Sequence, residues 1–273
     1  MAKEKKMNNK GIVFFDVDGT LIDWTKKIYD PTKATKLAIE KLRENGYLTV
    51  LATGRPMNCV HKSILDLGLD GYVASNGAYL EINNKVLFNE TLDNKELKIL
   101  LDFLEENNVV YILEGQEYDY VLDMKNEKLT SFIEEAHLDK NNFKEDWDKD
   151  TVKVSKIIAL SYDENSFNLV FEKFKEKGYA FMSNLSNGGV FEIYKAKYSK
   201  GYGVEQLLNL LDISRDKAYA FGDGENDIEM FQAVKYGIAM GGCHESLKPY
   251  AYDFTEDVAN EGIEKGLRRL NLI

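Results

Sequence analysis

The stretch GIVFFDVDGTLID, residues 11–23, limits the fold more than any other part of the chain. Its first five residues are too few for a helix and too continuously apolar for a strand with one face in water. Such a run is typical of a central strand in a parallel sheet that is covered on both faces. Two carboxylates only two positions apart, Asp16 and Asp18, follow this strand directly. The sequence therefore places two like charges directly after a buried strand, which requires an explanation.

Apolar strands alternate with amphipathic helices at short spacing, near the N-terminus and again near the C-terminus. The first helix is expected over residues 30–46, with Leu37, Ile39 and Leu42 as its apolar stripe and Gly46 as its end. The other expected elements are the strands 47–54, 71–75, 218–222, 236–240 and 252–255 and the helices 56–67, 226–234 and 260–270. This alternation predicts an α/β fold whose doubly wound parallel sheet forms a Rossmann-like core.

The middle of the chain has a different pattern. A hairpin is expected at residues 78–88, with Asn83 and Asn84 at its turn, and further strands and helices follow it. We interpret this part as an α+β domain inserted into the first. The predicted domains are a core made of residues 1–79 and 196–273 and an inserted domain made of residues 80–195.

The composition excludes several classes of partner. The formal net charge of −11 argues against a surface for nucleic acid or anionic membranes, because such surfaces need clustered Lys and Arg. No apolar stretch approaches the ~18 residues of a membrane span, and no apolar region of a signal peptide follows the charged N-terminus. Cys59 and Cys243 lack metal-type spacing and are expected to be buried thiols rather than a disulfide. We therefore expect a cytoplasmic protein, and nothing in the sequence indicates an oligomeric state.

The carboxylates Asp16 and Asp18 fall at the carboxyl edge of the predicted sheet, where open α/β sheets bind their ligands. Two carboxylates this close repel each other unless a cation lies between them or they divide into two roles, such as nucleophile and general acid. The alternative is a plain turn, because Asp and Gly are common turn residues.

The second predicted strand ends in ATGRP, residues 52–56, at the same edge of the sheet. The hydroxyl of Thr53 and the amide of Gly54, together with the start of the next helix, could hold phosphate oxygens there. An ordinary turn between strand and helix explains Gly54 equally well.

An acidic loop, FGDGENDIEM at residues 221–230, follows another apolar strand. It offers Asp223, Glu225, Asn226 and Asp227, a density of hard oxygen ligands that suggests Mg²⁺. The alternative is an acidic N-cap and first turn of a helix, which the helix dipole favours without any ligand.

A charge count favours the metal. Lys200 begins a predicted helix, where the dipole disfavours a cation, which suggests a nearby anion. The carboxylates Asp16, Asp18, Asp223 and Asp227 contribute −4 and Lys200 contributes +1, so a phosphate dianion would be repelled. With Mg²⁺ the charge falls to about −1. The sequence therefore predicts a metal-assisted site for phosphoryl transfer.

These motifs, in this order, resemble the haloacid dehalogenase (HAD) superfamily of phosphatases. DVDGTL is similar to its first motif, Thr53 to its second, Lys200 to its third and GDGEND to its fourth. Together with SNGA at residues 75–78 and the long insertion, the pattern resembles the Cof-type subfamily, which carries a large α/β cap of type IIB.

The resemblance implies a Mg²⁺-dependent phosphatase that acts on a small phosphorylated metabolite, such as a sugar phosphate, FMN or pyridoxal phosphate. It implies that Asp16 attacks phosphorus to form an aspartyl-phosphate and that Asp18 serves as general acid and then general base. The remaining implied roles are phosphate binding by Thr53, Gly54, Lys200 and Asn226, metal binding by Asp16, the main-chain carbonyl of Asp18 and Asp223, and support by Asp227. The inserted cap would select the leaving group.

Three other functions stay open. A phosphosugar mutase would use the same aspartyl-phosphate, a signalling module would keep it, and a binding protein would retain the fold without turnover. Within the insertion, several positions could face a leaving group or simply pack on the surface or in hairpins: Tyr111, Glu114, Tyr118, Asn184 and Glu192.

Overall fold

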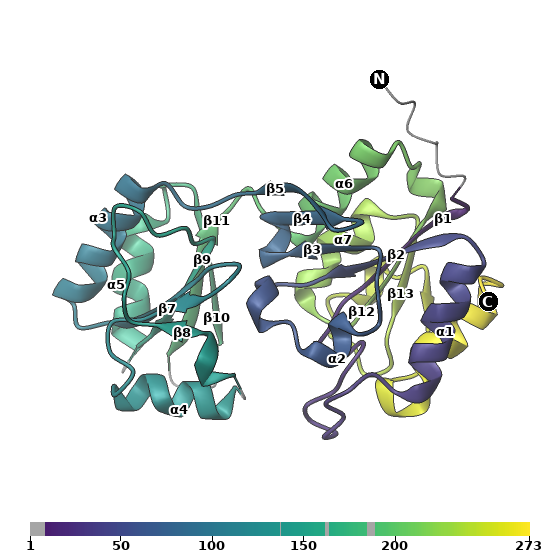
Figure 1. The fold of residues 1–273 in the computed structure, drawn as a ribbon, viewed down its shortest axis with the longest axis horizontal. Coiled ribbons are helices and arrows are strands. Elements are labelled where there is room, and N and C mark those ends of the chain that lie inside the picture. The colour runs from purple at the N-terminus through teal and green to yellow at the C-terminus, as the bar shows by residue number, and fades with distance from the viewer. Residues whose placement is uncertain (1–8, 137, 162–163, 185–188) are drawn as a thin grey trace. The chain divides into compact units, whose positions relative to one another are not determined.

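The computed structural model describes residues 9–136, 138–161, 164–184 and 189–273 (Figure 1). Two compact units make up the chain. The core unit extends to Gly54 and continues over His61–Phe88 and Ser199–Ile273, and the insert unit comprises Arg55–Val60 and Asn89–Tyr198. Among the described residues, no helix has both the length and the hydrophobicity needed to cross a bilayer.

Eight strands form the sheet of the core unit, in the order β14-β13-β12-β1-β2-β3-β4-β5. The strands are β1 Gly11–Phe15, β2 Tyr47–Ala52, β3 Gly71–Ala74, β4 Tyr79–Ile82, β5 Lys85–Asn89, β12 Ala218–Gly222, β13 Tyr236–Ala239 and β14 Asp253–Phe254. All pairs from β14 to β3 are parallel, and β4 is antiparallel to β3. The strand order runs outward in both directions from β1, which confirms the predicted doubly wound sheet.

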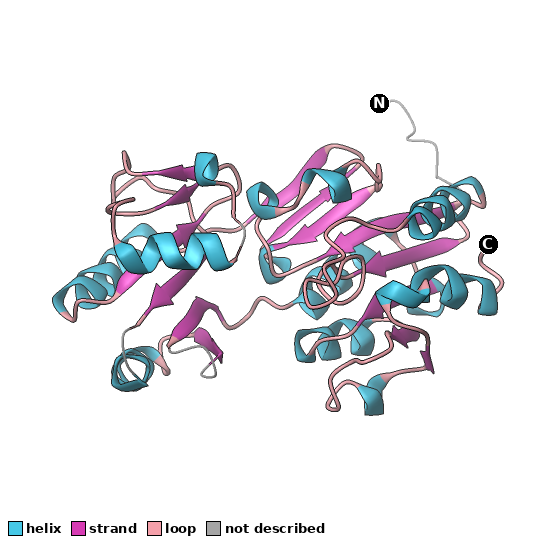
Figure 2. Ribbon diagram, turned by 90° about the horizontal axis from the view of Figure 1, so that it is seen from below, coloured by secondary structure: helices cyan, strands magenta, loops and turns pink. Residues whose placement is uncertain are grey.

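Helices cover both faces of this sheet (Figures 1 and 2). They are α1 Lys33–Glu44, α2 Lys62–Leu65, α6 Lys200–Leu211, α7 Ile228–Ala233 and α8 Gly262–Arg269. Side chains of a strand alternate between faces, so Ile12 and Phe14 of β1 join Val204 of α6 and Met230 of α7 in one apolar cluster. On the opposite face, the ring of Phe15 stacks on that of Phe221 at 5.5 Å, and α1 and α8 pack against each other.

Two expectations for the helices of the core unit are wrong. Ile39 and Leu42 of α1 are buried as predicted, but Leu37 is 55% exposed, because the buried stripe follows Thr35, Ala38, Ile39 and Leu42. The single helix expected over residues 56–67 is instead a 3-10 turn at Met57–Cys59 followed by the short α2.

The insert unit holds a six-stranded sheet in the order β10-β11-β9-β6-β7-β8. Its strands are β6 Val110–Glu114, β7 Asp119–Tyr120, β8 Phe143–Lys144, β9 Lys156–Leu160, β10 Tyr179–Asn184 and β11 Val190–Lys195, and its helices are α3 Asn94–Glu106, α4 Glu127–Glu135 and α5 Glu164–Phe174. The four strands from β10 to β6 pair antiparallel. Leucines of α3 pack on one face of the sheet, and Leu129 and Ile133 of α4 pack on the other. This architecture confirms the predicted α+β insertion.

The hairpin expected at residues 78–88 forms as β4 and β5, and both strands extend the core sheet beyond β3. The change from core unit to insert unit therefore falls after Phe88, and the return falls at Ser199. The borders expected from the sequence lie at residues 80 and 195. The first border lies later than expected because an antiparallel hairpin can be added to the edge of a parallel sheet without a crossover.

Candidate active site

The chemistry-bearing residues of the core unit follow the carboxyl ends of three neighbouring strands. Asp16 comes directly after β1, Asp223 directly after β12, and Thr53 directly after β2. The register pairs Phe15 with Phe221 on one side and with Leu51 on the other. Parallel strands thus deliver these side chains to a single edge of the sheet.

Lys200, the first residue of α6, lies at the centre of this site. Its ammonium is 2.5 Å from Oδ1 of Asp16 and 2.7 Å from Oδ1 of Asp227. All three side chains are almost fully buried. The two carboxylates thus offset the unfavourable interaction between the ammonium of Lys200 and the helix dipole.

Asp227 also organises the acidic loop that follows β12. Its Oδ2 accepts hydrogen bonds from the backbone N–H groups of Asp223 and Gly224, each at 3.0 Å. On the other side of Asp223, the hydroxyl of Thr20 donates to Oδ1 at 3.3 Å. Gly19 makes this approach feasible, because its φ is +78° and a Cβ there would lie 2.0 Å from Oδ2 of Asp223.

The site carries more negative charge than the chain itself compensates. Oxygens of Asp16, Asp223 and Asp227 lie within 4.8 Å of one another, so three carboxylates face one ammonium. Burial raises the pKa of Asp16 well above its usual range, against the opposing effect of Lys200. Burial and the neighbouring Asp227 raise the pKa of Asp223 to about 6. Burial works against the charge of Lys200, yet Asp16 and Asp227 together raise its pKa.

This acidic cluster fits a divalent cation. All of its donors are carboxylate oxygens, the hard ligands that Mg²⁺ prefers, and two positive charges would balance the excess of two carboxylates. Both oxygens of Asp227 already accept hydrogen bonds from the chain. Asp16 and Asp223 are therefore the side chains best placed to hold a metal.

Of the other predicted phosphate contacts, Thr53 and Gly54 follow β2, and Asn226 immediately precedes Asp227. Thr53 is buried, and its backbone N–H donates to the carbonyl of Val73 in β3 at 2.8 Å. A Cβ on the next residue, Gly54, would lie 2.8 Å from Oδ1 of Asn76. Asn226 is exposed in the 3-10 turn Glu225–Asp227.

The turn after β3 supports the site, a role that sequence reasoning did not assign. Its buried residues Ser75 and Asn76 both have positive φ, at 49° and 52°. A Cβ on Gly77 would lie 2.3 Å from the carbonyl oxygen of Ser199, the N-cap of α6. This turn therefore packs on the helix end that carries Lys200. The signal that could have identified it is the succession of Asn and Gly, which tolerate positive φ.

A second missed residue is Trp24, whose indole N–H donates to Oδ1 of Asp18 at 2.8 Å. A single tryptophan in a loop carries no periodic signal, so only the tertiary structure identifies it.

The polar positions singled out in the insertion are engaged within the insert unit. Tyr111 donates to Glu105 at 2.6 Å, and Lys156 pairs with Glu114 at 2.8 Å and Glu192 at 3.0 Å. The ammonium of Lys144 lies 3.2 Å from the ring centroid of Tyr118. The side chain of Asn184 lies outside the described residues. Packing within the unit thus accounts for the described positions.

The two cysteines are free thiols, Cys59 half-buried and Cys243 buried.

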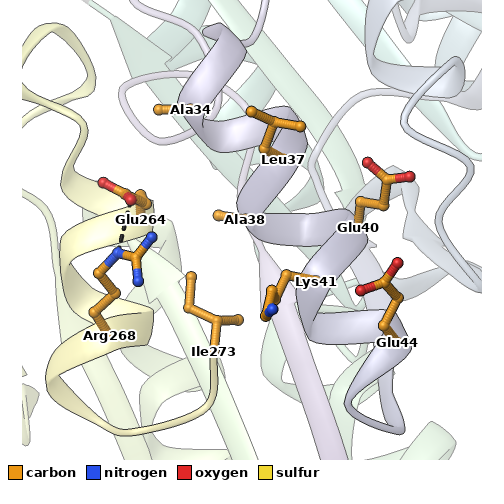
Figure 3. A pocket seen from close by; sticks show the side chains of 9 residues that line it. All are labelled: Ala34, Leu37, Ala38, Glu40, Lys41, Glu44, Glu264, Arg268 and Ile273. Atoms are coloured by element: carbon orange, nitrogen blue, oxygen red, sulfur yellow. Dashed lines mark hydrogen bonds and ion pairs between the residues drawn. The ribbon is translucent and has the colours of Figure 1, made fainter.

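A separate hollow of about 340 Å³ lies between α1 and α8 of the core unit (Figure 3). Its lining includes the exposed Leu37, and Arg268 pairs with Glu264 on α8 at 2.7 Å. Neither helix contributes a residue to the acidic cluster, so this hollow is not part of the candidate active site.

Comparisons with known proteins show the family of this chain. The sequence model of the haloacid dehalogenase-like hydrolases matches residues 13–267. The chain is 25% identical over 270 residues to the putative phosphatase YkrA of Bacillus subtilis, covering 96% of this chain and 98% of that protein. A hypothetical protein from Geobacillus kaustophilus has a similar structure, with a TM-score of 0.87, 26% identity and coverage of 96% and 99%. The fold also matches that of BT4131, described as a HAD subclass IIB sugar phosphatase, with a TM-score of 0.80, 23% identity and coverage of 96% and 100%. The chain belongs to the haloacid dehalogenase-like hydrolases and is a phosphatase of that superfamily.

Proposed function

We propose that this phosphatase hydrolyses small phosphomonoesters through an aspartyl-phosphate on Asp16 and depends on Mg²⁺. The observation that supports the proposal most directly is the buried contact of Asp16 with Lys200, beside Asp223 and Asp227. The ammonium of Lys200 favours the charged form of Asp16 against the effect of burial, and it offers a cation to phosphoryl oxygens. A nucleophile and a phosphate-binding cation thus lie within one hydrogen bond of each other.

Each residue has a separate task in the proposed reaction. A carboxylate oxygen of Asp16 attacks phosphorus, and the protonated Asp18 gives its proton to the departing oxygen. Asp18 then accepts a proton from water as that water attacks the aspartyl-phosphate and releases Asp16. Lys200 and Thr53, with Gly54 and Asn226, hold the phosphoryl oxygens, and Asp227 keeps Lys200 and the acidic loop in position.

Asp16, Asp223 and the main-chain carbonyl of Asp18 would hold the metal. When bound, Mg²⁺ supplies positive charge that offsets the carboxylates and polarises a phosphoryl oxygen. We assign selection of the substrate to the insert unit, and we propose sugar phosphates and phosphorylated cofactors such as FMN or pyridoxal phosphate as the compounds to test first.

The experiment that tests the proposal uses 4-nitrophenyl phosphate in the presence of Mg²⁺. Replacement of Asp16 with Asn should abolish hydrolysis, because the amide is a poor nucleophile, whereas substantial remaining activity would refute the role of Asp16. A phosphoryl group labelled with ³²P on the wild-type protein should be transferred to water and released as phosphate. Transfer of the label to a sugar instead would identify a mutase.

A further inference from the structure

The side chain of Trp24 makes a direct contact with the proposed acid of the reaction. Its indole N–H donates to Oδ1 of Asp18 at 2.8 Å, six residues earlier in the chain. Trp24 itself is half-buried. Its ring lies 5.0 Å from that of Tyr29, with an angle of 50° between the two ring planes.

The loop that carries Trp24 is closed on itself and anchored. Asp23 and Ile28 exchange two backbone hydrogen bonds of 2.8 and 2.9 Å. Within the loop, Oδ1 of Asp23 accepts from the N–H groups of Thr25 and Lys26. The ammonium of Lys26 lies 2.6 Å from Asp257, elsewhere in the core unit. The backbone of Trp24 is therefore held, and the indole is presented from a constrained loop.

We propose that Trp24 is a positioning residue that fixes the carboxyl group of Asp18 for proton transfer. This proposal rests on the function proposed above. An indole N–H can only donate, so the oxygen that it contacts, Oδ1, must present a lone pair. In a protonated carboxyl group the carbonyl oxygen accepts hydrogen bonds more strongly than the hydroxyl oxygen, so the contact favours the proton on Oδ2 when Asp18 is protonated. The contact thus favours Oδ2 as the oxygen of Asp18 that exchanges the proton.

The indole suits a residue that changes protonation state during turnover. A carboxylate oxygen and the carbonyl oxygen of a protonated acid both accept a hydrogen bond. The contact at Oδ1 therefore persists while Oδ2 of Asp18 loses its proton and regains it. A lysine in the same place would favour the charged form. The neutral donor of Trp24 orients the acid in both forms.

The proton balance of the two steps shows where positioning matters. In the first, the bond between Asp16 and phosphorus forms as the bond to the leaving oxygen breaks, and that oxygen takes its electron pair and the proton from Oδ2 of Asp18. In the second, water loses a proton to Oδ2 as its oxygen bonds to phosphorus, and Asp16 departs as a carboxylate. The indole N–H of Trp24 gives up no proton in either step.

The first step makes the proposal testable, because a basic leaving group needs the proton from Asp18 and an acidic one does not. Values of kcat/KM for aryl phosphates report on the steps up to departure of the leaving group. For Trp24→Phe we expect kcat/KM to fall about tenfold with phenyl phosphate and less than about twofold with 2,4-dinitrophenyl phosphate. The ratio of the two values is taken on a single preparation, so partial loss of folded protein cancels.

Trp147→Phe is the matched control. Trp147 lies in the insert unit, and its indole N–H donates to the carbonyl of Val121 at 2.8 Å, so its loss should leave the ratio unchanged. An equal loss with both substrates in Trp24→Phe, or no loss, would overturn the proposal. Asp18→Asn tests the role of Asp18 separately from that of Trp24. This variant should lower kcat/KM selectively for phenyl phosphate, and if it does not, the proposed role of Asp18 as the general acid fails.

Discussion

The ammonium of Lys200 lies 2.5 Å from Oδ1 of Asp16, and both side chains are buried. The two residues are 184 positions apart in the sequence, so the ion pair joins the N-terminal and C-terminal segments of the core unit. Asp227 contacts the same ammonium at 2.7 Å. Loss of the ammonium would leave two buried carboxylates without their cation.

Replacement of Lys200 with Met should lower the free energy of unfolding by about 3 kcal/mol, because a buried charge that loses its partner is strongly destabilising. Thermal unfolding of the full chain measures this effect as a lower Tm. Lys235→Met is the matched control, since Lys235 pairs with Asp216 at 2.8 Å on the surface, where such pairs contribute little to stability. Equal falls in Tm for the two variants would contradict the importance of the buried pair.

Mg²⁺ should raise the Tm of the wild-type protein, because a ligand that binds the folded state stabilises it, by about 2.7 kcal/mol at a hundredfold excess over Kd. Asp223→Asn should remove most of this shift, since Asp223 is one of the two side chains best placed to hold the metal. Glu225→Gln should keep the shift, because Glu225 belongs to the same loop but is exposed and outside the cluster. An unchanged shift in Asp223→Asn would mean that Mg²⁺ binds elsewhere.

The sequence could predict the edge of the sheet at which the site forms. Runs such as GIVFF and AYAFG are recognisable as covered parallel strands, and the ends of such strands meet at one edge. The meeting of Asp16 and Asp223 follows from that topology alone. The distance from Lys200 to Asp16 does not, because it depends on how α6 packs on the sheet.

Other features depend on contacts that no local pattern contains. Leu37 is apolar but lies off the buried stripe of α1. The helix expected over residues 56–67 is interrupted after Cys59, and Met57 and Asn58 form hydrogen bonds with Gln116 and Asn142 within the insert unit. These partners lie far along the chain, so the local sequence does not contain the contacts.

Gly77→Ala should impair both stability and catalysis. At φ +85° an alanine is strained, and its Cβ would lie 2.3 Å from the carbonyl oxygen of Ser199, immediately before Lys200. We expect a loss of about 2 kcal/mol or more from strain and displacement, and a fall in kcat of about tenfold because Lys200 shifts. Gly178→Ala isolates the strain, since Gly178 has φ +75° but nothing lies within 4 Å of its Cβ position. If both variants lost stability equally and kept full activity, the turn would not position α6.

A buried carboxylate in the insert unit should make the protein less stable as the pH rises. Burial raises the pKa of Asp119 to about 6, although the hydrogen bond from Cys59 and the charge of Lys156 lower it. Unfolded, the group titrates near 3.9. Between these values the folded state holds a proton that the unfolded state has released, so stability is complete below about pH 4 and falls until about pH 6. Glu114, whose pKa is raised by burial to about 7, acts in the same direction.

Asp119→Asn should therefore reduce the fall in Tm between pH 4 and pH 7. Two pKa units correspond to roughly 3 kcal/mol if the whole shift is realised, and the amide carries no charge at either pH. Its oxygen can still accept the hydrogen bond that the thiol of Cys59 makes to Asp119 at 3.3 Å, so packing is conserved. Asp146→Asn changes the same charge at an exposed position of the insert unit and should leave the pH dependence unchanged. If Asp119→Asn showed the wild-type fall in Tm, the pKa of Asp119 in the folded protein would not be raised into the range between pH 4 and pH 7.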